Sequence, residues 1–255
     1  MSEPVTQTTD AGLLTVRLAR AHGNAINAAV VEGLIAACRT AEADPAVRGV
    51  LLAASGKLFC PGLDLQELCE LDRPAMARFL DRFNTCVLAL YSLSKPMVAA
   101  LHGHAVAGGC VLALTADWRV LRYGAMIGLN EVRVGVPLPF GVARILCESV
   151  NASHREEVAL FGRNFTDDAA LASGLAHELR DATGLEEHCR ARLADLAERD
   201  ARAFALTKRH LRAATIDRLA SGDPGDADAW LDCWFSPPTR ERIAAVVRDL
   251  AARGG

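Results

Sequence analysis

The sequence predicts an α/β fold up to about residue 180, followed by a region built only from helices. In the first part, short apolar runs of the β type alternate with stretches in which apolar residues recur at helical spacing. From Gly184 onward the pattern contains no convincing strand. We therefore divide the chain into a core, residues 1–183, and a helical C-terminal region, residues 184–255.

Local patterns predict the individual elements. An alternating run over residues 13–19 and continuous apolar runs over 49–54 and 97–101 are typical of strands, and residues 117–121 are extended. Asp64 is the expected N-cap of a helix, with Glu67 in capping-box register. The predicted helices cover residues 28–43, 64–71, 75–93, 108–115, 184–200, 202–220, 226–235 and 239–252. A turn cluster at residues 221–225 predicts a linker.

Composition limits the class of protein. The chain has 255 residues, is 51% hydrophobic and carries a net charge of −3, so it can bury a full core and has no bulk attraction for nucleic acid or anionic membranes. No apolar run approaches the ~18 residues of a membrane span, and residues 1–10 lack the features of a signal or transit segment. Eight cysteines without a CxxC pair predict free thiols in a reducing compartment. We expect a cytoplasmic protein with neither nucleic-acid nor membrane partners.

Two glycine-containing corners each follow a buried strand and precede a helix. The first is Cys60-Pro61-Gly62-Leu63-Asp64-Leu65, and the second extends from His102 to Cys110. A turn of this kind can point backbone N–H groups outward, and two such groups aimed at one oxygen form an oxyanion hole. Leu63 and Gly108 are the candidate donors. The alternative is that the glycines serve only tight turns.

Glu131 is the candidate catalytic base. It lies downstream of the second corner, between Leu129 and Val132 in an apolar stretch. An apolar setting raises the pKa of a carboxyl group and makes it a plausible general base near neutral pH. The alternative is a solvated carboxylate in a surface loop.

Other polar residues of the corners favour structural roles. His102 and His104 lie two apart and would share one face of a strand, but no Asp, Glu or Cys completes a ligand set, so no metal site is expected. Cys60 and Cys110 lack a nearby His arranged to activate a thiolate, and packing is the favoured interpretation for both.

These segments resemble the crotonase (enoyl-CoA hydratase/isomerase) superfamily over nearly the whole chain. The most specific stretch extends from Lys95 through the second corner to Asp117. Three segments resemble in particular the mitochondrial-type Δ3,Δ2-enoyl-CoA isomerases: Gly62-Leu-Asp-Leu-Gln-Glu-Leu, Gly108-Gly-Cys-Val-Leu-Ala-Leu-Thr-Ala-Asp and Ile127-Gly-Leu-Asn-Glu-Val.

The resemblance implies a spiral of ββα units and a C-terminal helical trimerisation region, hence a homotrimer or a dimer of trimers. It also implies that an acyl-CoA binds with its thioester carbonyl between the N–H groups of Leu63 and Gly108. Coenzyme A would be part of the substrate, so no separate cofactor is expected. Cys60, Pro61 and Leu65 would contact the substrate beside the first corner, and Lys57 and Lys208 are candidates for its phosphates. The alternative for both lysines is an ordinary surface position.

One position separates the reactions of this superfamily. Its hydratases use two glutamates, of which the second corresponds to Glu131 and the first falls on Val111. Hydration needs two groups to handle water and a proton, whereas double-bond migration needs one base. The resemblance therefore implies an isomerase that converts cis- or trans-3-enoyl-CoA to trans-2-enoyl-CoA. The alternatives are an enoyl-CoA hydratase or other thioester chemistry of the family, and a non-catalytic scaffold that binds CoA thioesters. Pro137 and Pro139, after the glutamate, leave the acyl chain length open.

Overall fold

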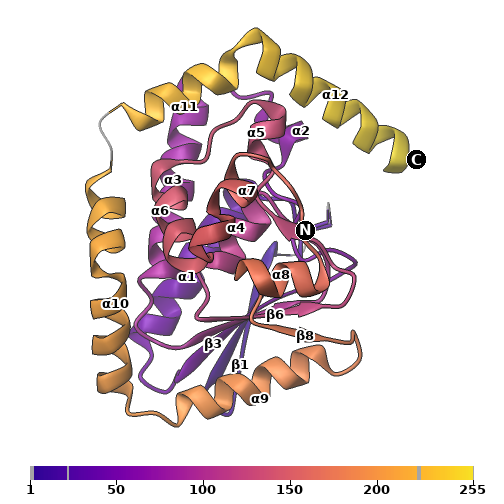
Figure 1. Ribbon diagram of the computed structural model, residues 1–255. Coiled ribbons are helices and arrows are strands. Elements are labelled where there is room, and N and C mark those ends of the chain that lie inside the picture. Colours follow the sequence, from indigo (N-terminus) through magenta and orange to yellow (C-terminus); the bar gives the residue numbers. More distant parts are fainter. Residues whose placement is uncertain (1–2, 22, 223–224, 255) are drawn as a thin grey trace.

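The computed structural model describes residues 3–21, 23–222 and 225–254. In this part of the chain a main sheet has the strand order β1-β2-β3-β4-β6-β8, in which β1 pairs antiparallel with β2 and the other pairs are parallel (Figure 1). The predicted α/β class is confirmed. The strands are β1 (Val5–Asp10), β2 (Leu13–Leu18), β3 (Gly49–Ala54), β4 (Met97–Leu101), β6 (Trp118–Arg122) and β8 (Glu178–Arg180).

The order strand, short strand, helix occurs repeatedly along the core. After β4 come the short strand β5 (Ala105–Val106) and helix α4 (Gly108–Leu114), and after β6 come β7 (Ile127–Gly128) and α5 (Glu131–Val134). Strands β5 and β7 form a second, parallel sheet, to which Cys60 adds a bridge before α2 (Leu65–Leu68). These are the ββα units of the expected spiral. Since corresponding strands run parallel, the helices α2, α4 and α5 begin next to one another.

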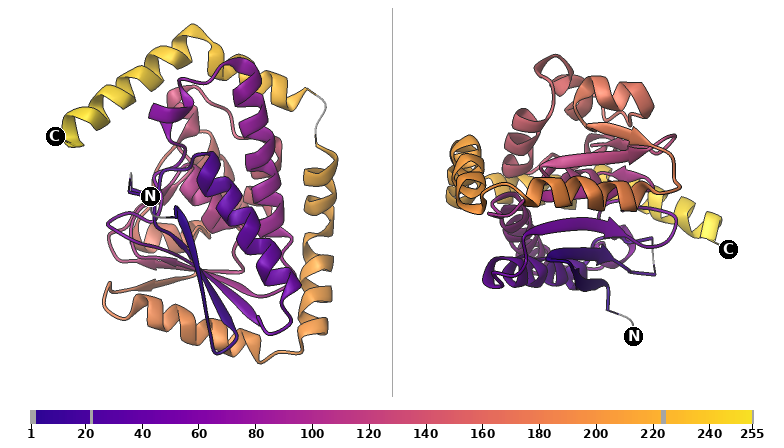
Figure 2. Two further views of the ribbon diagram at one scale, coloured as in Figure 1. Left: turned by 180° about the vertical axis from the view of Figure 1, so that it is seen from behind. Right: turned by 90° about the horizontal axis from the view of Figure 1, so that it is seen from below.

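Both faces of the main sheet are covered. Val50 and Leu52 of β3 belong to the large core formed with α1 (Ala28–Ala43) and α3 (Arg73–Tyr91). Leu51, between them, belongs to a second cluster with Leu193 of α9 (Leu185–Ala197). This alternation explains why β3 is a continuous apolar run. Helices α1 and α3 lie side by side, as the view from behind shows (Figure 2).

The C-terminal helices frame the core (Figure 1). Helix α10 (Ala201–Ser221) packs against α3 and α6 (Phe140–Ser149), α11 (Asp226–Phe235) packs on α3, and α12 (Pro237–Gly254) contacts α2 and α5. No strand follows residue 184 in the described residues, as predicted. Residues 223 and 224 of the expected linker lie outside the described residues, and the division at residue 183 stays a prediction. The segment between β7 and β8 also contains a 3₁₀ turn (Ala152–His154), α7 (Arg155–Ala159) and α8 (Asp167–Ser173).

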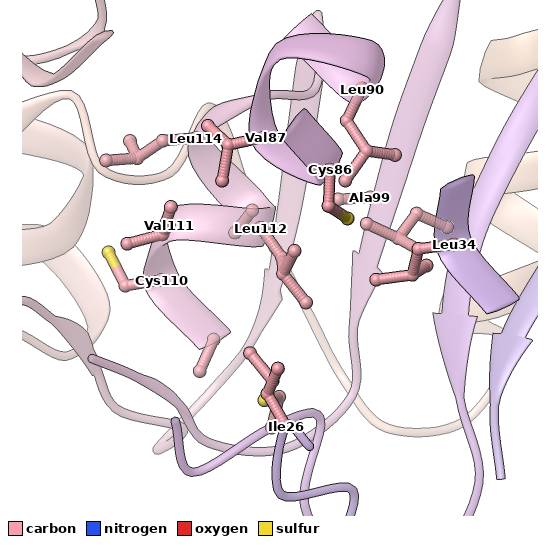
Figure 3. Close-up of a cluster of buried hydrophobic side chains, with 14 of the residues drawn as sticks. Ile26, Leu34, Cys86, Val87, Leu90, Ala99, Cys110, Val111, Leu112 and Leu114 are labelled. Carbon is pink, nitrogen blue, oxygen red and sulfur yellow. The ribbon is translucent and has the colours of Figure 1, made fainter. Parts of the chain in front are cut away.

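Side chains of α4 anchor the second corner in the core. Figure 3 shows Val111, Leu112 and Leu114 among residues of α1 and α3. All eight cysteines lie in the described part of the chain and are free, and Cys60, Cys86 and Cys110 are fully buried. Among the described helices, none combines the length and the apolar character that a membrane span requires.

Candidate active site

The two glycine-containing corners lie in direct contact. Gly62 has φ +109°, and a Cβ atom added to it would lie 2.9 Å from Cβ of Ala107 and 3.3 Å from N of Gly108. On the other side, Ala107 itself has φ +50°, which is uncommon for a residue other than glycine. Only a residue without a side chain fits at position 62, so the glycine is needed for both its conformation and its space.

Backbone hydrogen bonds hold the corners together. Val106 N–H donates to the carbonyl of Cys60 at 3.0 Å, which joins the two corners. Ile26 N–H donates to the carbonyl of Gly62 at 2.8 Å, and Asp64 N–H donates back to Ile26 at 2.9 Å. These bonds flank Leu63 and leave its own N–H unused. Within the described part of the chain, neither Leu63 N–H nor Gly108 N–H has a hydrogen-bond acceptor.

Glu131 is attached to the same structure through β7. Ala107 N–H donates to the carbonyl of Gly128 at 2.8 Å, and Glu131 begins α5 shortly afterwards. Its Oε2 atom is buried and has no hydrogen-bond partner. Burial raises the pKa of the Glu131 carboxyl to about 7, and a hydrogen bond from its own backbone N–H opposes that rise only in part. A carboxyl group with such a pKa can accept and return a proton near neutral pH.

One cavity of about 200 Å³ brings these groups together. Leu63, Gly108 and Glu131 all line it, and among the described residues around it Glu131 carries the only acidic or basic side chain. Val111 also lines it, at the position where the resemblance would put a second glutamate in a hydratase. The other lining residues are apolar apart from Asn130 and the two indole rings: Pro61, Leu65, Phe79, Leu80, Phe83, Ala107, Val134, Val136, Pro137, Pro139, Trp230, Trp234 and Val246.

The raised pKa predicts a specific pH dependence. Only the carboxylate of Glu131 is a base, so the rate should rise with pH through about 7 and fall about tenfold per pH unit below it.

The stability of the folded protein should change with pH in the opposite sense. The folded-state pKa exceeds the ordinary 4.5, so the contribution of Glu131 to stability is full below 4.5 and is lost as pH rises through about 7. The pH dependence of the rate checks the first prediction. Thermal unfolding of the wild type and of Glu131→Gln, each measured below pH 4.5 and above pH 7, checks the second. A flat rate profile through about pH 7 would contradict Glu131 as the base.

Only some of the residues predicted to contact the substrate line the cavity. Pro61 and Leu65 line the cavity. Cys60 does not line it, and burial raises the pKa of its thiol to about 12, in agreement with a packing role. Lys57 is exposed in a separate hollow that it shares with Arg20, so its role toward a phosphate stays a prediction.

The expectation for Lys208 needs correction. Its side chain is buried on α10, where Nζ donates to Asp117 at 2.7 Å and to the carbonyl of Lys95 at 3.0 Å. Arg212 donates to the other carboxylate oxygen of Asp117 at 2.9 Å. Burial lowers the pKa of Lys208 to about 8. This ammonium group is bound inside the protein, away from the cavity, and fastens α10 to the core.

The corner histidines have structural partners. His104 Nδ1 accepts a hydrogen bond from Met126 N–H at 2.9 Å, and His102 Nε2 lies 2.9 Å from the carbonyl of Gly56. Both rings tie neighbouring turns together, as the sequence pattern favoured.

Sequence reasoning missed the aromatic wall of the cavity. Phe79 and Phe83 lie one turn apart on α3, and Trp230 and Trp234 lie one turn apart on α11. Their spacing places each pair on one helix face, and this is the only local signal they carry. That the two faces meet across a cavity depends on how α11 crosses α3, which no local pattern specifies.

Comparison with known proteins agrees with this geometry. The family model described as enoyl-CoA hydratase/isomerase matches residues 8–232, and the chain belongs to this family. It is 28% identical over 221 residues to human mitochondrial enoyl-CoA delta isomerase 1, a match that covers 85% of this chain and 72% of that protein. It is 33% identical over 241 residues to a probable enoyl-CoA hydratase of Mycolicibacterium paratuberculosis, covering 94% and 85%.

A solved structure shows the same fold. The crystal structure of human mitochondrial delta3-delta2-enoyl-CoA isomerase superposes with a TM-score of 0.94 at 25% identity and covers 99% of this chain and 100% of that one. The recognised superfamily is thus confirmed, and the protein is an enzyme of the enoyl-CoA hydratase/isomerase family. Relatives named for either reaction match about equally well, so the choice between the two reactions depends on the site.

Proposed function

We propose that the protein is a Δ3,Δ2-enoyl-CoA isomerase that moves the double bond of cis- or trans-3-enoyl-CoA to give trans-2-enoyl-CoA. The observation that carries the proposal is that the described residues of the cavity wall hold a single carboxylate. Glu131 supplies a base, and Val111 occupies the position of the second glutamate of the hydratases.

The geometry supports a simple sequence of steps. The thioester carbonyl oxygen accepts hydrogen bonds from Leu63 N–H and Gly108 N–H, both of which lack another acceptor in the described chain. These bonds stabilise the negative charge that develops on the oxygen. The Glu131 carboxylate removes a proton from C2, which gives a dienolate, and then returns the proton at C4. The double bond ends between C2 and C3, and the enzyme regains its starting state.

The same geometry disfavours efficient hydration. Addition of water to a 2-enoyl thioester needs one group to deprotonate the water and a proton donor for C2. Among the described residues of the cavity wall, Glu131 alone has a titratable side chain. An apolar surface around the acyl group also excludes water, which protects the dienolate from side reactions.

Val111→Glu should create weak hydratase activity. Val111 is buried in the cavity wall on α4, so a glutamate there would face the same substrate as Glu131. Two close carboxyl groups raise the pKa of one of them and supply an acid and a base near neutral pH. We expect measurable hydration of crotonyl-CoA where the wild type shows almost none, with a loss of stability from the buried charge.

Val111→Gln is the control for Val111→Glu, because it has the same shape without the charge. It should gain no hydratase activity. Equal hydration by the two variants would show that a second carboxylate is not what the site lacks.

We also keep the prediction of a homotrimer or a dimer of trimers in the cytoplasm. Large apolar side chains remain exposed on the described surface of one chain, among them Leu160, Phe161 and Leu211. Leu160 and Phe161 follow α7 and Leu211 lies on α10, and contact with neighbouring subunits would cover side chains of this kind. Light scattering at micromolar concentration should give three or six chains, and a monomer would contradict the prediction.

The direct test of the proposed function is incubation with a panel of 3-enoyl-CoA substrates while the absorbance of the conjugated 2-enoyl thioester is followed. The proposal expects this absorbance to grow with enzyme concentration. No growth with any member of the panel would contradict it.

A further inference from the structure

Burial of the lining residues gives the cavity a direction. Pro61 is exposed, and Leu63, Leu65 and Asn130 are half-buried, so the first corner lies toward its mouth. Apart from Val111, which lies beside the second corner on α4, the almost completely buried side chains of the lining include Phe79, Leu80, Phe83, Val136, Trp230 and Trp234, and we take these as its inner end. A substrate with its thioester at the corners therefore extends its acyl chain toward the buried aromatic residues.

Two aromatic pairs form this inner end. Phe79 and Phe83 of α3 stack with ring centroids 6.4 Å apart, and Trp230 and Trp234 of α11 stack at 5.3 Å. Trp230 and Trp234 are 3% and 1% exposed, so little space remains behind them. Large, closely packed aromatic rings cannot easily move aside, so they limit how far a ligand extends into an apolar cavity.

Polar contacts hold the tryptophan-bearing helix in place. Arg73 at the start of α3 pairs with Asp232 of α11 at 2.7 Å, and Asp226 accepts a hydrogen bond from Phe140 N–H at 3.1 Å. In α12, Thr239 donates to the carbonyl of Gly135 at 3.1 Å and Arg240 donates to the carbonyl of Cys69 at 2.7 Å. Helices α11 and α12 are thus fastened to the rest of the chain at several separate points. The position of the tryptophans is set by the fold and not by the ligand.

We propose that Trp230 and Trp234 set the upper limit of acyl chain length, so that the enzyme accepts unbranched apolar acyl groups that end before these rings and rejects longer ones. This inference rests on the proposed function in that the acyl group of a CoA thioester occupies this cavity. It adds the residues that determine specificity and the class of acyl group.

The inner end also disfavours a polar acyl terminus. No acidic or basic side chain of the described residues lines it, and the two indole N–H groups are the only polar side-chain atoms that its described residues offer. A terminal hydroxyl or carboxylate would lose its water without gaining a charged partner.

The test measures binding instead of turnover. Saturated acyl-CoA thioesters from butanoyl to hexadecanoyl are titrated into the wild-type protein by calorimetry. Each methylene that enters the apolar cavity should tighten binding by up to about fourfold. Beyond the length that reaches the tryptophans, the dissociation constant should stop falling or should rise.

Trp234→Leu should move this break to a longer acyl chain, and Trp234→Phe should move it less. Phe235→Leu is the matched control, because Phe235 follows on the same helix and packs on the core without lining the cavity. It should leave the break where the wild type has it. If Trp234→Leu does not fold, as thermal unfolding would show, Trp234→Phe carries the test because it keeps a ring in the core.

A break that stays in place in both folded Trp234 variants would overturn the inference, as would affinity that rises through hexadecanoyl-CoA in the wild type. Tighter binding of an ω-hydroxyacyl-CoA than of its unsubstituted counterpart would also overturn it and would assign the indole N–H groups to a polar terminus. Because the ligands are saturated, these results do not depend on the reaction. A break that shifts in a protein with no isomerase activity would support the inference while the proposed function fails.

Discussion

Glu131→Gln should lower the isomerisation rate by ~10²–10⁴-fold, the usual effect of removing a general base. The amide keeps the size of the side chain but cannot accept the proton from C2 at neutral pH. Binding should change little, because Leu63 N–H and Gly108 N–H are backbone groups that the substitution does not alter. The variant should also be at least as stable as the wild type above pH 7, where the wild type holds a buried carboxylate with an unpartnered oxygen.

The measurements are kcat with a 3-enoyl-CoA and the dissociation constant of a saturated acyl-CoA. Glu187→Gln removes the same charge from an exposed position of α9 and should behave as the wild type. Retention of more than about a third of the wild-type kcat by Glu131→Gln would show that the base is another group.

Gly62→Ala should lower kcat by ~10²–10³-fold, the effect of losing one oxyanion donor. Its Cβ would lie 2.9 Å from Cβ of Ala107, so the two corners must move apart, and the N–H groups of Leu63 and Gly108 move with them. The variant should fold with reduced stability, since an L-residue at φ +109° costs about 1–3 kcal/mol.

Gly184→Ala is the control for Gly62→Ala, because it introduces the same kind of backbone strain away from the cavity. Gly184 has φ +75°, nothing lies within 4 Å of an added Cβ, and it precedes α9 outside the cavity wall. It should lose stability but keep its kcat. If Gly62→Ala, folded, retains full activity, the corners are not the oxyanion site.

Much of the architecture could be predicted because its signals are local. The helix at residues 28–43 and the strands at 49–54 and 97–101 have the predicted bounds, since their apolar spacing matches the faces they bury. Asp64 accepts the N-cap hydrogen bond from Glu67 N–H at 3.1 Å, as its position in the sequence predicted. Pro74 lies in the first turn of α3, where a proline costs no helical hydrogen bond.

Elements whose stability comes from tertiary contacts were missed. Strand β1 has only Val5 buried and a polar sequence, and it forms because β2 pairs with it along its whole length. Strand β8 has three residues and pairs with the edge of β6. Helix α5 has four residues, too few for a periodic pattern.

The candidate site also combines residues that have a local signal in the sequence with residues that have none. Glycine corners and an isolated carboxylate in an apolar stretch are visible in the sequence, and one cavity joins Leu63, Gly108 and Glu131, whose catalytic roles stay predictions. Lys208 was misplaced because a lysine on a helix looks exposed until its partner, Asp117, is known to lie beneath it. Trp230 and Trp234 could be assigned to the cavity only once α11 was seen to cross α3.

The central claim is that one carboxylate moves a proton and that no second group adds water. A single incubation of a 3-enoyl-CoA with the wild-type protein, with the products separated by chromatography, tests it most directly. The account predicts that trans-2-enoyl-CoA accumulates and that 3-hydroxyacyl-CoA stays a trace product. Conversion onward to 3-hydroxyacyl-CoA at a rate that matches or exceeds the isomerisation would contradict it and would require a second catalytic group in the site.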